Sequence, residues 1–204
     1  MATIDFVYFD LGNVVVNFSH QLACQQLAEV SRVPVASVWA AVFESGLQIR
    51  FECGLITCEE FHAEFSEATR SQSSVHELIF AFSDIFSINV PLLPLITELA
   101  TLNFPRGVLS NTCLSHWQHV TEKYAIVRDL LPVRLLSYEE HSMKPDPEIY
   151  QAAIRLAGFE PGRIFFVDDR AENVTGALAA GMDAVLFESV GGLRRELFQR
   201  GLNV

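Results

Sequence analysis

The chain has 204 residues, of which 50% are hydrophobic and 19% are charged, a balance that excludes intrinsic disorder and predicts one domain, or one domain with a modest insertion. Its formal net charge of −11 argues against nucleic acid as a partner, because a face that binds phosphate backbones needs an excess of Lys and Arg. A small anionic substrate stays compatible with this charge, since it needs only a few local donors or a metal ion.

Leader, membrane and cysteine patterns together favour a cytoplasmic location without a membrane partner. No positively charged leader opens the chain, whose first apolar run begins almost at once. The most apolar later stretch, residues 90–104, contains two prolines and Glu98 and is too short to cross a bilayer, so we expect a buried helix there. The four cysteines follow no paired disulfide framework, which suits a reducing compartment. None of these features predicts the oligomeric state.

A buried strand is predicted at residues 6–9, where the sequence Phe-Val-Tyr-Phe runs directly into Asp10. A short apolar run rich in β-branched and aromatic residues and bounded by turn formers is typical of a strand buried on both faces. Ligands of open parallel sheets bind at the carboxyl ends of the strands. Asp10 is therefore the first candidate catalytic residue.

Residues 17–88 are predicted to form helices without any strand between them, because their apolar residues recur at roughly helical spacing. Thr57 followed three residues later by Glu60 is the capping-box signature of a helix start. We expect a small all-helical cap at residues 17–88, inserted into a core that comprises residues 1–16 and 89–204.

From residue 91 onward, predicted helices and strands alternate. The strands are expected at residues 106–109, 133–136, 164–167 and 184–187, and the better-defined helices at residues 92–102, 148–157 and 193–200. Such alternation predicts an α/β fold in which right-handed crossovers place helices on both faces of a parallel sheet. The expected architecture is a Rossmann-like doubly wound sheet that the helical cap interrupts after its first strand.

Polar residues stand at the strand ends and before one helix: Asp10, Ser110 with Asn111, Lys144, and Asp168 with Asp169. Parallel strands bring such residues to one edge of the sheet. Carboxylates at one place repel each other unless a cation neutralises them, and oxygen-only ligands suit Mg²⁺. A hydroxyl, backbone N–H groups before a helix and a lysine form an anion site. The set therefore predicts phosphoryl transfer to Asp10 through an aspartyl-phosphate intermediate.

These residues also resemble the four motifs of the haloacid dehalogenase-like (HAD) hydrolases, in the subfamily with a small helical cap. The motifs correspond to Phe9–Val14, Val108–Thr112, Lys144-Pro145, and Val167–Asp169 with Asn173. The four motifs stand in the family's order and in the expected strand contexts. The resemblance covers essentially the whole chain. Within the family, the sequences of the first two motifs most resemble those of sugar phosphatases of the glucose-1-phosphate phosphatase type.

The resemblance implies a role for each matching residue at the phosphate. Asp10 would be the nucleophile and a Mg²⁺ ligand, and Lys144 the catalytic cation that neutralises charge on the nucleophile and the phosphate. Ser110 and the backbone of Asn111 would hold the phosphoryl oxygens. Three further residues would lie at the phosphate or the substrate: Gly12, Asn13 and His116.

The resemblance implies a Mg²⁺ site as well. Asp169 would bind the metal directly, Asp168 directly or through its neighbours, and Gly12 through its backbone carbonyl, with Asn173 in support. The implied substrate is a small phosphorylated metabolite, with sugar phosphates as the expected class.

Gly12 departs from the family pattern, since most phosphatases of the family carry there a second Asp that protonates the leaving oxygen and activates water. Losing such a group typically removes a factor of about 10²–10⁴ in rate. An acidic leaving group, such as the anomeric oxygen of a sugar 1-phosphate, needs this acid least. Two alternative functions follow from Gly12: a metal-free 2-haloacid dehalogenase, against which the Asp168-Asp169 pair argues, and a phosphate-binding regulatory module without turnover.

Two smaller patterns leave their interpretation open. His116 and His119, three residues apart on a predicted helix, could bind a metal, or one could lie near the leaving group while the other is solvated. Arg50 to Glu52 precede a turn at Gly54. This turn could reach the active site and contact the substrate, and a solvated turn of the cap explains the pattern equally well.

Overall fold

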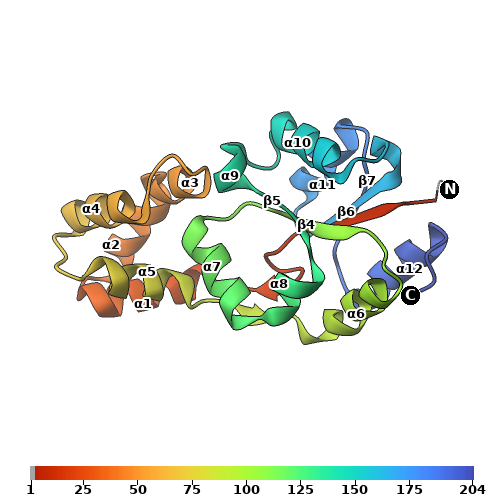
Figure 1. Cartoon of the computed structure of the whole chain (residues 1–204). Helices are drawn as coiled ribbons and strands as arrows, with labels where there is room; N and C mark the ends of the chain where they lie inside the picture. Colours follow the sequence, from red (N-terminus) through yellow and green to blue (C-terminus); the bar gives the residue numbers. More distant parts are fainter. Residues whose placement is uncertain (1–2) are drawn as a thin grey trace.

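The computed structural model describes residues 3–204, and a five-stranded sheet forms its centre (Figure 1). All neighbouring strands are parallel, in the order β5-β4-β1-β6-β7. Their bounds are Phe6–Phe9 for β1, Arg106–Ser110 for β4, Val133–Leu136 for β5, Ile164–Asp168 for β6 and Asp183–Leu186 for β7. The predicted doubly wound α/β fold is confirmed, and the predicted strands lie within one residue of the observed ones.

Helices cover both faces of this sheet (Figure 1). On one face lie α10 (Pro147–Ala157) and α11 (Ala171–Ala179), and on the other α6 (Leu93–Thr101), α7 (Leu114–Lys123), α8 (Ala125–Leu130) and α12 (Val190–Gln199). Successive side chains of β1 point to opposite faces, so that Phe6 and Tyr8 belong to one apolar cluster while Val7 and Phe9 belong to the other. Burial on both faces explains why this strand is apolar throughout.

A lobe of helices lies beside the sheet, at the left of Figure 1. It consists of α1 (His20–Ser31), α2 (Val35–Trp39), a π-helical turn (Ala40–Glu44), α3 (Leu47–Glu52), α4 (Cys58–Thr69) and α5 (Val75–Ser83). The predicted capping box is present, since Thr57 Oγ1 accepts from Glu60 N and the Glu60 carboxylate accepts from Thr57 N. The lobe has its own apolar filling, in which the ring centroid of Phe61 lies 4.8 Å from Phe51 and 5.0 Å from Phe82.

Two short strands at the ends of this lobe correct the expectation of helices alone. β2 (Val16–Asn17) pairs antiparallel with β3 (Ser87–Ile88), and Asn89 Nδ2 donates to Val14 O at 2.7 Å. The ribbon holds together the two chain segments that enter and leave the lobe. A two-residue strand is too short to show periodicity, which is why the sequence did not reveal it.

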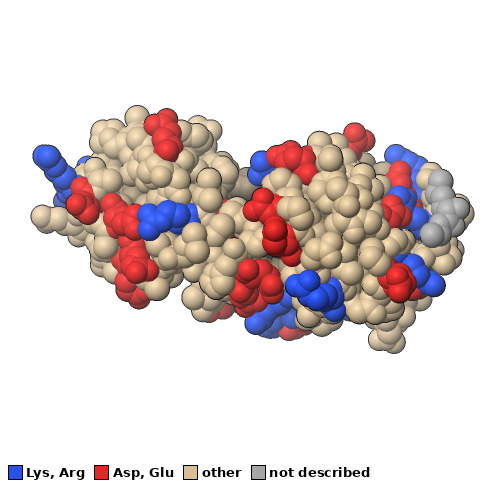
Figure 2. All heavy atoms as spheres, turned by 90° about the horizontal axis from the view of Figure 1, so that it is seen from above, with Lys and Arg blue, Asp and Glu red and all other residues tan. Residues whose placement is uncertain are grey.

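The remaining helical segments are short: α9 (Ser137–Glu140) and two 3₁₀ turns, Val90–Leu92 and Pro161–Arg163. None of the helices in residues 3–204 combines the length and the hydropathy needed to cross a bilayer. On the face seen in Figure 2, Lys and Arg side chains stand in small groups beside Asp and Glu rather than in one continuous basic surface. The exclusion of nucleic acid stays a prediction from net charge.

Candidate active site

Two carboxylates meet between β1 and β6, the two strands from which the chain crosses to opposite sides of the sheet. β1 and β6 are neighbours, with Phe9 opposite Val167, so Asp10 and Asp168 stand side by side at their carboxyl ends. From β1 the chain continues to β4 on one side, and from β6 it continues to β7 on the other. In doubly wound sheets this divergence opens the crevice in which ligands bind.

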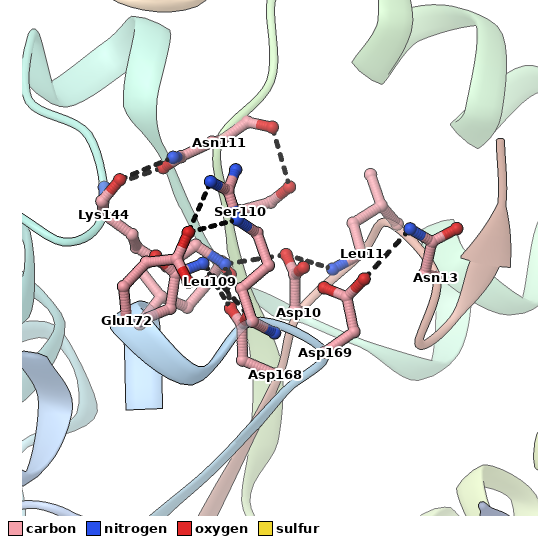
Figure 3. A network of polar contacts seen from close by, with 12 residues as sticks. Asp10, Leu11, Asn13, Leu109, Ser110, Asn111, Lys144, Asp168, Asp169 and Glu172 are labelled. Atoms are coloured by element: carbon pink, nitrogen blue, oxygen red, sulfur yellow. Dashed lines mark hydrogen bonds and ion pairs between the residues drawn. The ribbon is translucent and has the colours of Figure 1, made fainter. Parts of the chain in front are cut away.

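Lys144 is buried between these carboxylates (Figure 3). Its Nζ donates to Asp10 Oδ1 at 2.8 Å, to Asp168 Oδ2 at 2.6 Å and to Leu109 O at 2.9 Å, which matches its three donors to three acceptors. Burial alone would lower the pKa of Lys144, but the two carboxylates outweigh it and raise the pKa. Lys144 therefore carries a positive charge that both carboxylates share.

Asn111 fixes the backbone of Lys144. Its side-chain Nδ2 donates to Lys144 O and its Oδ1 accepts from Lys144 N, both at 2.8 Å. The two hydrogen bonds join the segment after β4 to the loop before α10, across 33 residues of sequence. The Asn111 side chain thus positions the lysine, and Asn111 itself lines the cavity.

Asp10 is held rigidly by one of its two carboxylate oxygens. Oδ1 accepts from Lys144 Nζ and from Leu11 N at 2.7 Å, whereas no hydrogen bond from residues 3–204 engages Oδ2. Burial, together with the negative charge of Asp168, raises the pKa of Asp10 to about 7 against the opposing effect of Lys144. One oxygen is thus fixed and the other stays available as a nucleophile or ligand.

Three carboxylates form an oxygen-only cluster suited to a hard cation. One oxygen each from Asp10, Asp168 and Asp169 lie within 4.8 Å of one another. A single lysine leaves this cluster with excess negative charge, and one or two carboxylates are the usual protein ligands of Mg²⁺. The donor set therefore fits the expected metal.

Asp168 and Asp169 differ in how the protein engages them. Asp168 is fully buried and accepts from Lys144 Nζ, from Arg170 N and, with both oxygens, from Asn173 Nδ2 at 3.0 Å. Within the described part of the chain, Asp169 accepts one hydrogen bond, from Asn13 Nδ2 at 3.0 Å (Figure 3). This difference favours Asp169 as the direct metal ligand, with Asp168 orienting Lys144, and gives Asn173 its supporting contact.

A cavity of about 140 Å³ opens in front of these groups. Its lining includes all the residues expected at the site except Asp168, which lies beneath it: Asp10, Gly12, Asn13, Ser110, Asn111, His116, Lys144, Asp169 and Asn173. Ser110 is the last residue of β4 and is buried. Segments far apart in the sequence are thus brought to one place.

His116 lines the cavity beside Phe82 and Phe86. Its Nε2 donates to Phe82 O at 3.0 Å, and its ring stacks on Phe82 with 4.4 Å between centroids. Burial lowers the pKa of His116 to about 4, so the imidazole is neutral at pH 7. His119 instead donates to Asp84 Oδ1 at 3.1 Å.

Phe18 occupies the space beside Gly12. A Cβ atom built on Gly12 would lie 2.6 Å from Phe18 Cε1, closer than such atoms approach in proteins. The aromatic ring therefore stands where a side chain at position 12 would begin. No sequence signal pointed to Phe18, because its ring packs against Phe86 from a distant segment of the chain.

Glu52 is a cavity residue whose role the sequence left open. It ends α3, is buried, and lines the cavity with Gln48 of the same helix. Of the two interpretations of the Gly54 turn, the one in which it reaches the site is therefore favoured for Glu52. Arg50 instead forms an exposed ion pair with Glu64, and Phe51 fills the lobe. His20 and Arg170 also line the cavity, and neither had a sequence signal.

Comparison with known proteins assigns this chain to a family. A sequence model of haloacid dehalogenase-like hydrolases matches residues 4–181, which confirms the resemblance inferred from the four motifs. Flavin mononucleotide hydrolase 1 of Arabidopsis thaliana is 30% identical over 156 residues, 76% of this chain but 62% of that protein. D-ribitol-5-phosphate phosphatase of Bacteroides thetaiotaomicron is 22% identical over 94% of this chain and 95% of its own.

Solved structures share the whole fold. The HAD family enzyme BT-2542 of Bacteroides thetaiotaomicron, in complex with magnesium and inorganic phosphate, superposes with a TM-score of 0.83 and 26% identity over 93% of this chain and 98% of its own. The chain matches less than two thirds of the length of the first two curated relatives, 62% and 46%.

Proposed function

Since this chain belongs to the haloacid dehalogenase-like hydrolases, we propose that it is a Mg²⁺-dependent phosphatase of small phosphorylated metabolites, with sugar phosphates as the substrate class. The observation that carries the proposal is the buried group in which Lys144 Nζ contacts Asp10 at 2.8 Å and Asp168 at 2.6 Å, with Asp169 beside them. Phosphoryl transfer to a carboxylate needs this combination of a fixed nucleophile, a cation and an anion site.

Asp10 attacks phosphorus in line and forms an aspartyl-phosphate, while the alkoxide of the substrate leaves. Lys144 neutralises charge on Asp10 and on the phosphoryl oxygens, and the hydroxyl of Ser110 with the backbone of Asn111 holds these oxygens at the sheet edge. Water then hydrolyses the aspartyl-phosphate and regenerates Asp10. Mg²⁺, held by Asp10, Asp169 and the Gly12 carbonyl, would neutralise charge that develops on the transferred group.

The substrate class is supported by the size and lining of the cavity. Its volume of about 140 Å³ is small beside the roughly 300–1,000 Å³ typical of ligand pockets. A sugar or polyol phosphate, the substrate class in the name of the ribitol-5-phosphate phosphatase, fits this space better than a flavin nucleotide does. We assign the cap to residues 17–88, whose helices supply Glu52, Gln48 and Phe82 to the cavity.

The first experiment measures p-nitrophenyl phosphate hydrolysis with Mg²⁺ and with excess EDTA, in the parent protein and in Asp10→Asn. We expect turnover in the parent protein with Mg²⁺, and background rates in EDTA and in Asp10→Asn. Asp129→Asn, which alters an exposed carboxylate on α8, is the matched control and should keep full activity.

Two results would overturn the proposal. An inactive parent protein across a broad panel of phosphate monoesters would favour the regulatory phosphate-binding module. Halide release from 2-haloacids without Mg²⁺ would favour the dehalogenase, whose chemistry has no metal ion for Asp169 to bind.

A further inference from the structure

The cavity contains one carboxyl group that the proposed reaction does not yet use. Among residues 3–204, three carboxylates line it: Asp10, Asp169 and Glu52. Asp10 is assigned as the nucleophile and Asp169 as a metal ligand, so Glu52 alone is uncommitted. It is 9% exposed, and its Oε1 accepts from Gln48 Nε2 at 2.7 Å. A buried carboxyl with one hydrogen bond in a substrate cavity needs a reason to be there.

Position 12 cannot supply a proton donor in this chain. Gly12 has no side chain, and the ring of Phe18 closes the adjoining space at 2.6 Å from an added Cβ. Alkoxide departure from an unactivated phosphate ester still requires a proton, and the second half of the reaction requires a base for water. The group that handles this proton must therefore come from another part of the cavity wall.

The backbone around Glu52 is fixed onto the core. Ser137 Oγ, fully buried, donates to Glu52 O at 2.6 Å and accepts from Thr112 N at 2.9 Å. His141 Nδ1 donates to Cys53 O at 3.0 Å. These contacts join the end of α3 to α9 and to the segment that follows β4, and they hold the backbone of Glu52 against the core.

The charges around Glu52 suit a group that exchanges a proton near neutral pH. Burial is the largest effect and raises the pKa of Glu52 to about 7, with Asp10 adding to it and with Gln48 and Arg170 opposing it. A general acid or base works best when its pKa lies near the operating pH. The two imidazoles of the cavity are less suitable acids, because burial lowers the pKa of both His20 and His116.

We infer that Glu52 is the general acid and base of this enzyme and takes over the proton transfer that a residue at position 12 cannot perform; the inference rests on the proposed phosphatase function. As Asp10 Oδ2 forms its bond to phosphorus and the ester P–O bond breaks, the Glu52 carboxyl gives its proton to the leaving oxygen. The Glu52 carboxylate then takes a proton from a water molecule as the oxygen of that water attacks phosphorus. The bond between phosphorus and Asp10 breaks, inorganic phosphate leaves, and Glu52 is protonated again.

With Glu52 in this role, hydrolysis is not restricted to acidic leaving groups. The sequence alone, through Gly12, favours the anomeric oxygen of sugar 1-phosphates. The structure instead predicts that the parent protein also hydrolyses unactivated esters such as sugar 6-phosphates. Glu52 comes from the helical lobe, so docking of this lobe on the core completes the catalytic site.

The test compares Glu52→Gln with the parent protein on two kinds of ester. For an alkyl phosphate such as a sugar 6-phosphate, whose leaving oxygen needs a proton, kcat/KM should fall by about 10²–10⁴-fold. For p-nitrophenyl phosphate, whose leaving group departs as a stable anion, kcat/KM should fall by less than about tenfold. For p-nitrophenyl phosphate, the kcat of Glu52→Gln should fall more than its kcat/KM. A burst of p-nitrophenol should also appear, because the attack of water on the aspartyl-phosphate lacks its base in this variant. Glu52→Asp, which keeps a carboxyl group, should restore part of the loss.

Glu59→Gln, an exposed carboxylate on α4, is the matched control and should behave like the parent protein. Equal losses of Glu52→Gln on both esters would overturn the inference and make Glu52 a binding or packing residue. So would full activity of Glu52→Gln, or a leaving-group-dependent loss in His20→Gln instead. Since Asp10→Asn separately tests whether the protein is an aspartyl-phosphate phosphatase, these outcomes refute the role of Glu52 without refuting the proposed function.

Discussion

His116 shows how burial changes the charge of a single residue. It lies between the rings of Phe82 and Phe86 and donates its Nε2 proton to Phe82 O. Burial lowers the pKa of His116 to about 4, whereas histidine in an unfolded chain has a pKa near 6.5. The unfolded chain therefore binds a proton first as the pH falls. The stability that neutral His116 contributes is present above about pH 6.5 and is lost as the pH falls towards 4.

This linkage predicts a pH-dependent difference between the parent protein and His116→Gln. Urea unfolding at pH 7.5 should show the variant less stable than the parent protein, and the comparison is repeated at pH 4.5. The gap in free energy of unfolding should be about 2–3 kcal/mol smaller at pH 4.5, because protonation of unfolded His116 penalises only the parent protein. Contributions from Asp10 and Glu52 run in the opposite direction in this range and cancel in the difference. A gap that does not change with pH would mean that His116 is charged or solvated in the folded protein.

At the level of elements, the contact between the end of α3 and α9 decides whether the cavity is complete. Gly54 has a φ of +65°, and a Cβ atom there would lie 2.2 Å from Tyr138 O. Glycine is required at this position twice, for its backbone conformation and for the close approach of the helical lobe to α9. This approach also sets where Glu52 stands.

Gly54→Ala should therefore weaken both folding and catalysis. The left-handed conformation costs about 1–2 kcal/mol for a residue with a Cβ, and the collision with Tyr138 O adds to it. Gly46→Ala is the matched control, since Gly46 has a φ of +79° in the same lobe and nothing within 4 Å of an added Cβ. We expect urea unfolding to show a loss in both variants, and kcat/KM for a sugar 6-phosphate to fall in Gly54→Ala alone. Equal effects on activity would refute the link between this contact and the site.

The sequence predicted those elements whose signals are local. The apolar run of β1 and the capping box at Thr57 both depend on residues close to one another in the chain. The carboxyl-edge residues were found because parallel strands dictate where their ends lie. The β2–β3 ribbon, the ring of Phe18 beside Gly12 and the position of Glu52 depend on packing between distant segments. Ser137 holds Glu52 across 85 residues of sequence, and no single-sequence pattern contains that information.

For the whole molecule, the metal site should be visible in stability as well as in catalysis. The chain carries a net charge of −11 and brings three carboxylates together around one lysine. A cation that binds only the folded state raises stability by about 2.7 kcal/mol at a hundredfold excess over its Kd. For a chain of this length, each kcal/mol corresponds to roughly 2–4 °C in Tm.

Thermal unfolding with Mg²⁺ and with excess EDTA tests this expectation. The Tm should rise by about 5–10 °C with saturating Mg²⁺ and should return to its original value when EDTA is added. Asp169→Asn should lose most of the shift, because it removes a proposed ligand. NaCl at equal ionic strength is the control for general screening of the acidic surface. A shift of the same size with NaCl, or one that persists in Asp169→Asn, would contradict the assignment of the site.

The central claim is that Asp10 carries the phosphoryl group during turnover. The most direct measurement stops the reaction in acid during steady-state hydrolysis of p-nitrophenyl phosphate and locates added mass on peptides of the chain by mass spectrometry. We predict the mass of one phosphoryl group on Asp10, increased in Glu52→Gln and absent in Asp10→Asn. Steady turnover with no phosphorylated peptide, or with the phosphoryl group on another residue, would contradict the account.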